Sequence, residues 1–147
     1  MTRLRARRFE SGARRGWVYT LSSVLAAPGA VLAHHSISGV YDSSRQVTVE
    51  GRVVEFQFVN PHPFLVVATD SDANSPKTWR LEMDNRYELA EIGITAVTFV
   101  PGDRVIATGS AARAEAQSLY LMKLDRPADG LRYEQVGTSP RISRAGQ

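Results

Sequence analysis

The three histidines of the chain fall in only two places. His34 and His35 are adjacent, and His62 stands in an Asn-Pro-His-Pro run. Imidazole nitrogens bind copper and zinc, and a zinc site with three of them can keep one coordination position open. If the mature chain begins at His34, its α-amine adds a further ligand, and the Irving–Williams order then favours copper(II). The pattern predicts a copper or zinc site formed by His34, His35 and His62.

A simpler interpretation of these histidines stays open. His34 and His35 would lie in a polar arm that binds nothing, and His62 would only form a hydrogen bond within its turn. Either ring nitrogen of a histidine can hydrogen-bond to the backbone, so a histidine in a turn needs no metal to be explained.

The other potentially reactive residues give weaker indications of function than the histidines. Cysteine is absent, which excludes thiolate metal sites, disulfides and cysteine nucleophiles. Ser36 and Ser38 lack the Gly-x-Ser-x-Gly context of a nucleophile elbow. Trp79 and Tyr120 could form an aromatic platform for a sugar or peptide, although aromatic residues at strand spacing are usually core. An enzyme therefore ranks third among the functions considered, because no acid–base pair or nucleophile stands out.

The sequence favours two classes of function. One is an exported module that binds a divalent metal ion through the histidines. The other is an exported module without metal, whose barrel face or sheet edge binds a peptide, a glycan or a partner protein. Metal analysis of the processed protein separates these classes.

The N-terminus has the pattern of a signal peptide. An arginine-rich lead is followed by the uncharged run Trp17–Leu32, and Ala33 ends a small-residue cleavage site. Arg14-Arg15 makes a twin-arginine route one option. We expect residues 1–33 to be removed, the protein to be periplasmic or secreted, and no stable membrane span to remain. An uncleaved N-terminal anchor is the alternative.

Removal of this segment reverses the sign of the charge. The chain holds 18 Lys or Arg and 15 Asp or Glu, and residues 1–33 contain six arginines and one glutamate. The remaining residues then hold 12 basic and 14 acidic side chains, a net charge of −2. Sequence-independent binding of nucleic acid depends on Lys and Arg contacts to phosphate, so we expect no nucleic-acid binding.

The strands that must position these residues begin with residues 46–58. Val47, Val49 and Val53 share one face of this run, which is the period of a strand with one buried side. Gly51 interrupts that face and indicates a bulge or a bend. Residues 63–69 are apolar nearly throughout, as expected for a strand covered on both faces.

The rest of the chain adds further strands and one helix. Residues 77–83 alternate, with Trp79, Leu81 and Met83 on one face. Asn85 and Glu88 have the spacing of a helix N-terminus, and Gly93 suits its end. Three more strands are predicted at residues 104–110, 118–124 and 131–136, with a small-residue loop at 111–117.

This order predicts an all-β fold with one short helix. It is that of a small, five- to six-stranded Greek-key barrel of the oligonucleotide/oligosaccharide-binding (OB) type, and a β-sandwich is the alternative. The expected organisation is a signal peptide at 1–33, a polar arm at 34–45, the barrel at 46–136 and a disordered tail at 137–147. The sequence does not predict an oligomeric state.

Several motifs together resemble a known family. They are His34-His35-Ser36 after the signal peptide, the strand Val47–Val53, Asn60-Pro61-His62, Trp79–Glu82 and Pro101–Val105. In this combination the chain is similar to the exported bacterial proteins grouped as domain of unknown function 6152. The resemblance implies export and a small β-barrel, and it implies no activity, because the family has none assigned.

Overall fold

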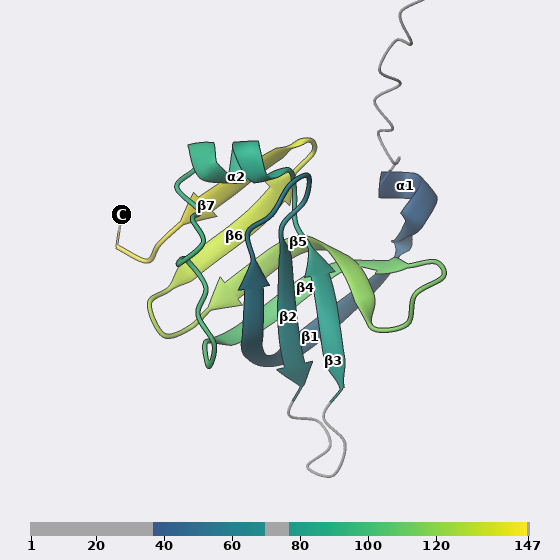
Figure 1. Ribbon diagram of the computed structural model, residues 1–147, viewed down its shortest axis with the longest axis horizontal. Helices are drawn as coiled ribbons and strands as arrows, with labels where there is room; N and C mark the ends of the chain where they lie inside the picture. Colours follow the sequence, from purple (N-terminus) through teal and green to yellow (C-terminus); the bar gives the residue numbers. More distant parts are fainter. Residues whose placement is uncertain (1–36, 70–76, 147) are drawn as a thin grey trace, which may run out of the picture. The chain divides into compact units, whose positions relative to one another are not determined.

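The computed structural model describes residues 37–69 and 77–146, and Figure 1 shows its elements. They are α1 (Ile37–Val40), β1 (Tyr41–Gln57), β2 (Phe64–Thr69), β3 (Thr78–Glu82), α2 (Arg86–Glu91), β4 (Arg104–Ala112), β5 (Ser118–Arg126), β6 (Leu131–Val136) and β7 (Ser139–Ser143). The strands are ordered β3-β2-β1-β4-β5-β6-β7, and β3 also pairs with β5. That parallel pairing closes β1 to β5 into a barrel with a helix between β3 and β4. The predicted OB-like Greek-key barrel is confirmed.

The alternation predicted for β1 is confirmed. Val49 and Val53 are buried, and Val47 packs against the same core from a partly exposed position. Gly51 marks a close approach of two strands, because a Cβ atom there would lie 2.1 Å from the carbonyl oxygen of Ala68. The register irregularity against β2 falls between Val53 and Glu55, beyond the glycine.

β2 buries only one of its faces. Leu65 and Val67 are fully buried, whereas Phe64 and Val66 are half-buried on the outer side. The prediction that both faces are covered was therefore wrong. The core is built from the inner faces of the strands, with side chains from the α2 region closing it. Its largest fully buried members are Tyr133, Phe99, Leu65, Leu81, Met83, Leu89, Ile94, Leu119, Leu121, Leu124, Leu131 and Val53.

α2 begins where the sequence predicts. The Asn85 side chain caps it by accepting a hydrogen bond of 2.9 Å from the Glu88 N–H. The Asn85 N–H donates to Asp84 Oδ1 at 2.7 Å, so an aspartate one residue earlier accepts the bond that a capping-box glutamate would take. Gly93 follows the helix with a φ of +87°, the left-handed conformation that glycine adopts without strain.

The C-terminal part is more ordered than predicted. The strand predicted at Leu131–Val136 is confirmed as β6. The tail predicted to be disordered from residue 137 instead contains β7, which pairs antiparallel with β6 and contacts α2 (Figure 1). Ile142 is the apolar residue that β7 packs against the core. A single such residue gives no periodicity, which is why the sequence pattern missed this strand.

The N-terminal part of the fold also differs from the prediction. The polar arm predicted to extend to residue 45 is already α1 at Ile37 and β1 at Tyr41. Tyr41 pairs with Ala112, so β4 also extends into the predicted 111–117 loop. The predicted signal peptide lies outside the described residues. No helix among the residues that the structure describes is long and apolar enough to cross a membrane.

Candidate functional site

His62 lies in the loop between β1 and β2, with 28% of its side chain exposed. Its Nδ1 is 3.1 Å from the carbonyl oxygen of Met83 and 3.4 Å from Oε1 of Glu82. Because a carbonyl oxygen can only accept, Nδ1 must carry the proton. Nε2 of the neutral ring then keeps its lone pair, and it makes no hydrogen bond to the residues described.

Glu82 joins this turn to the start of β1. Its second oxygen, Oε2, accepts a hydrogen bond of 2.5 Å from the hydroxyl of Tyr41. The parallel pairing of β3 with β5 sets Glu82 opposite Tyr120. We call Tyr41, His62, Glu82, Ser118 and Tyr120 the Glu82 cluster.

Both tyrosines of the Glu82 cluster stay protonated. Burial raises the pKa of Tyr41, and its hydrogen bond to the Glu82 carboxylate raises it further. Burial also raises the pKa of Tyr120, and the nearby carboxylates of Asp84 and Glu82 add to that rise. At neutral pH these phenols can therefore donate hydrogen bonds but cannot serve as bases.

One polar group of the Glu82 cluster is unsatisfied. The Ser118 hydroxyl is buried and lies near the Tyr41 hydroxyl, but it forms no well-aligned hydrogen bond with any of the described residues. Ser118 is also opposite Arg80 in the β3–β5 pairing. An unpaired buried hydroxyl in a native fold calls for an explanation, and proximity to a ligand site is one.

The aromatic platform considered for Trp79 and Tyr120 does not form. Trp79 packs against the main core, whereas Tyr120 belongs to a separate small cluster with Tyr41, Ala112 and Met122. The rings of Tyr41 and Tyr120 lie 5.8 Å apart with a tilt of 44°. Tyr120 is therefore a neighbour of the polar cluster, and Trp79 is a core residue.

The predicted metal ligands can be placed only in part. His34 and His35 lie outside the described residues, and His62 is the one that the structure places. Within the described ranges, no three His, Asp or Glu side chains gather closely enough to hold a metal ion. His62 and Glu82 form a pair, so a metal site here requires ligands from the remainder of the chain.

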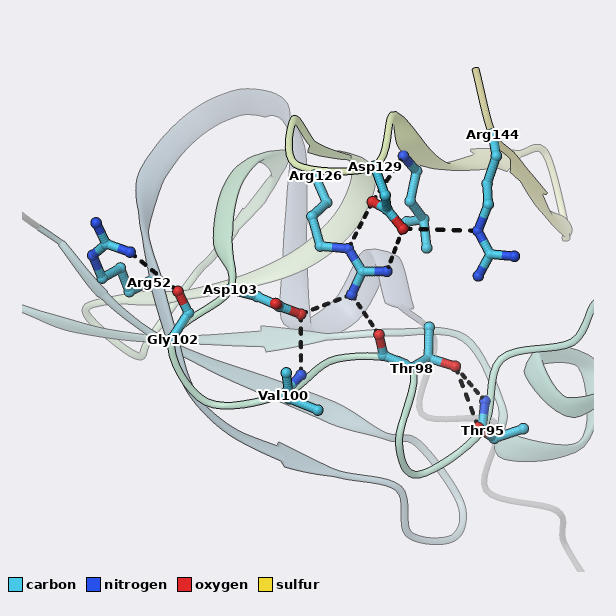
Figure 2. A network of polar contacts seen from close by, with 10 residues as sticks. Arg52, Thr95, Thr98, Val100, Gly102, Asp103, Arg126, Asp129 and Arg144 are labelled. Atoms are coloured by element: carbon cyan, nitrogen blue, oxygen red, sulfur yellow. Dashed lines mark hydrogen bonds and ion pairs between the residues drawn. The ribbon is translucent and has the colours of Figure 1, made fainter. Parts of the chain in front are cut away.

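A second polar network surrounds Arg126 (Figure 2). The Arg126 guanidinium donates two hydrogen bonds of 2.9 Å to Asp129, one of 2.7 Å to Asp103 and one of 2.5 Å to the carbonyl oxygen of Thr98. The bonds from Arg126 to Asp129 lower the pKa of Asp129 to about 2. The network ties the loop before β4 to the turn between β5 and β6.

Two surface hollows of the described part lie away from the Glu82 cluster, beside β5 and β6. One is lined by Lys123, Asp125, Arg132, Tyr133 and Glu134. Its charges pair with one another, since Lys123 contacts Glu134 at 3.1 Å and Arg132 contacts Asp125 at 2.8 Å. A hollow whose charges are already paired offers little to a ligand.

Sequence reasoning missed Tyr41, Glu82 and Ser118. Glu82 looked like an ordinary outward residue of a half-buried strand, and Tyr41 fell in the predicted arm. Only the register of β3 against β5 and the extension of β1 bring them together. No local pattern in the sequence reports either pairing.

Comparisons with known proteins give a family match and one structural likeness. No curated protein matches the chain significantly. Among solved structures, the chain is similar to the mitochondrial single-stranded DNA-binding protein Rim1 of S. cerevisiae. That likeness has 14% identity and a TM-score of 0.43, and it covers 55% of this chain and 91% of the other. The fold assignment rests instead on the strand pairing described above.

The family comparison covers most of the barrel. The model of a family of unknown function, DUF6152, matches residues 22–119. The match includes all three histidines and ends at the second residue of β5, so β6 and β7 lie beyond it. The chain belongs to the DUF6152 family.

Proposed function

We propose that the protein is an exported metal-binding module in which His34, His35 and His62 ligate one copper(II) ion. Zinc would bind to the same site more weakly. The observation that carries this proposal is the contact of His62 Nδ1 with the Met83 carbonyl. Metal-ligating histidines almost always donate their second N–H to a carbonyl or carboxylate, which fixes the ring and its tautomer. His62 has that arrangement before any metal binds.

The position of Tyr41 supports the participation of the N-terminal histidines. Its hydroxyl binds the same Glu82 carboxylate that contacts His62. His35 precedes Tyr41 by six residues. An extended chain of that length spans up to about 20 Å, and the turn of α1 shortens this span without abolishing it. The C-terminal end of the arm is thus held, at Tyr41, beside the turn that its histidines would have to reach.

Copper titration of three proteins tests the proposal. They are the chain beginning at His34, the same chain with one extra N-terminal glycine, and His62→Ala. We expect the first to bind copper most tightly, because the extra glycine displaces the α-amine and the substitution removes one imidazole. Binding should weaken below about pH 6, where imidazole is protonated.

A matching thermal-unfolding profile for His62→Ala is the control for folding. If all three proteins bind copper alike, or none binds it, the site does not exist. A module that binds a glycan, peptide or protein without metal would then be the better description.

A further inference from the structure

Two arginines lie on aromatic rings at the two ends of the His62 turn. The guanidinium carbon of Arg80 is 3.5 Å from the centroid of the Phe64 ring, and that of Arg86 is 4.9 Å from the centroid of Phe58. Phe58 precedes the turn and Phe64 follows it. Both distances are within the range of a cation–π contact.

Neither guanidinium has an acceptor among the described residues. No hydrogen bond or ion pair within that part of the chain involves the side chain of Arg80 or Arg86, and Arg141 on β7 is the one other arginine there of which this is true. Arg144 forms an ion pair with Asp129 at 3.8 Å. The others donate a hydrogen bond to a carbonyl or carboxylate oxygen: Arg45, Arg52, Arg104, Arg113, Arg126 and Arg132. Arg80 and Arg86 are thus stacked in place with unused donors.

Both arginines belong to the surroundings of the same turn. The Arg86 N–H donates to the carbonyl oxygen of Pro61 at 3.0 Å. Arg80 lies two residues before Glu82 on the outward side of β3, and the Glu82 carboxylate contacts His62. In barrels of this topology the face of strands 2 and 3 and the β1–β2 loop form the ligand surface.

We propose that Arg80 and Arg86 bind the carboxylate groups of an acidic sugar at this turn. A guanidinium presents a rigid fork that matches an oxyanion, and stacking on a ring reduces the freedom that binding must remove. Glu82 and His62 are 21% and 28% exposed beside them and can bond to hydroxyl groups. A sugar acid supplies both kinds of partner.

Nucleic acid fits these observations less well. A phosphate backbone is bound through many Lys and Arg contacts that release counterions. Here the residues after position 33 carry a net charge of −2, and most described arginines already have acceptors. Two stacked guanidiniums suffice for a short acidic glycan but not for a salt-stable nucleic-acid complex.

Calorimetric titration of the metal-free protein with tri-galacturonate tests this inference. Its fully methyl-esterified form is the matched probe, because it keeps the sugar rings and loses the charge. We expect the acid to bind and the ester to bind at least tenfold more weakly. Arg80→Lys and Arg86→Lys keep the charge but lose the fork, and each should weaken binding of the acid severalfold. Arg141→Lys is the control and should leave affinity unchanged.

Three results of the titrations would overturn the inference. They are no binding of tri-galacturonate, equal binding of acid and ester, or equal affinity of the Lys variants and the parent protein. Inorganic phosphate and a single-stranded 12-nucleotide DNA are run in parallel. Tighter, salt-sensitive binding of the DNA would make this surface a nucleic-acid interface instead. Because His62 is unchanged and metal is absent, none of these results bears on the copper proposal.

Discussion

The Arg126 network and the Glu82 cluster are both polar groups on a barrel with an apolar core, but they differ in how fully their hydrogen bonds are satisfied. Arg126 is 11% exposed and directs four hydrogen bonds to three partners (Figure 2). In the Glu82 cluster, the Ser118 hydroxyl forms no well-aligned hydrogen bond with any described residue, although the Tyr41 hydroxyl is near it, and His62 Nε2 makes no hydrogen bond to the described residues. A network satisfied internally stabilises a fold, whereas one with unused groups can bind a ligand.

The surroundings of the two groups strengthen this contrast. The Arg126 network joins a loop to a turn, which are the parts of a barrel that otherwise move most. The Glu82 cluster joins the start of β1 to the β1–β2 loop, next to two arginines without acceptors in the described part of the chain. We therefore assign stability to the first group and recognition to the second, and three substitutions and one pH titration test that assignment.

Arg126→Ala should have the largest effect. Among the described residues, it removes the only charged partner of the mostly buried Asp103, which keeps just the Val100 N–H as a donor, and the donor to the Thr98 carbonyl, so it should cost about 3 kcal/mol of unfolding free energy. Urea unfolding measures the loss. Arg132→Ala is the control, because the Arg132 side chain is 68% exposed and its contact with Asp125 should contribute little to stability. Equal losses would mean that the Arg126 network is not a structural clamp.

Tyr41→Phe should cost about 1–2 kcal/mol, because it removes a hydrogen bond to the Glu82 carboxylate while keeping the ring against Tyr120. The same urea experiment measures it. Tyr87→Phe, at a site 74% exposed, is the control and should change stability very little. A Tyr41→Phe loss as large as that of Arg126→Ala would place the Glu82 cluster among the structural networks.

Ser118→Ala should change stability by less than about 0.5 kcal/mol or raise it slightly, since removing an unpaired buried hydroxyl removes its desolvation cost. Ser110→Ala is the matched control on the neighbouring strand. Its hydroxyl, also buried, accepts a 3.0 Å hydrogen bond from Gln46, so that change should cost about 1 kcal/mol. If Ser118→Ala proves the more costly, the hydroxyl is paired and the contrast fails.

The smallest expected effect is on the stability of the fold at acidic pH. The pKa of Asp129 is lowered to about 2 in the folded protein, chiefly by the hydrogen bonds from Arg126. Its contribution to stability is therefore complete above the unfolded value near 3.8 and disappears as the pH falls through about 2. Asp129→Asn should flatten the stability profile between these pH values. An unchanged profile in that variant would show that Asp129 is not linked to folding.

The sequence predicted elements with strong local patterns and missed those set by pairing between distant segments. Val49, Val53, Leu81 and Met83 lie on the core faces that their alternation indicated. Trp79 lies on that face too, but it is only partly buried, so its truncation should cost less than a fully buried aromatic would. β7 was missed because Ile142 is its one core-packing apolar side chain.

The candidate site was less predictable than the fold. His62 was singled out because histidine is rare in this chain and can bind metals. Glu82 and Tyr41 are separated by 41 residues and meet through strand pairing that leaves no local signal. The same holds for Arg80 and Arg86, whose stacking on Phe64 and Phe58 depends on the β2–β3 register and on the start of α2.

The closure of the barrel also bears on solubility at high concentration. A sheet that closes on itself loses its lateral edges there, as β3 does where it pairs with β5, whereas β7 is the last strand of the described sheet and presents an open edge. That strand is five residues long and holds Pro140, which has no N–H to donate, followed by the exposed Arg141. Short length, proline and charge are the features by which natural proteins prevent strands of neighbouring molecules from adding to an edge and starting fibrils.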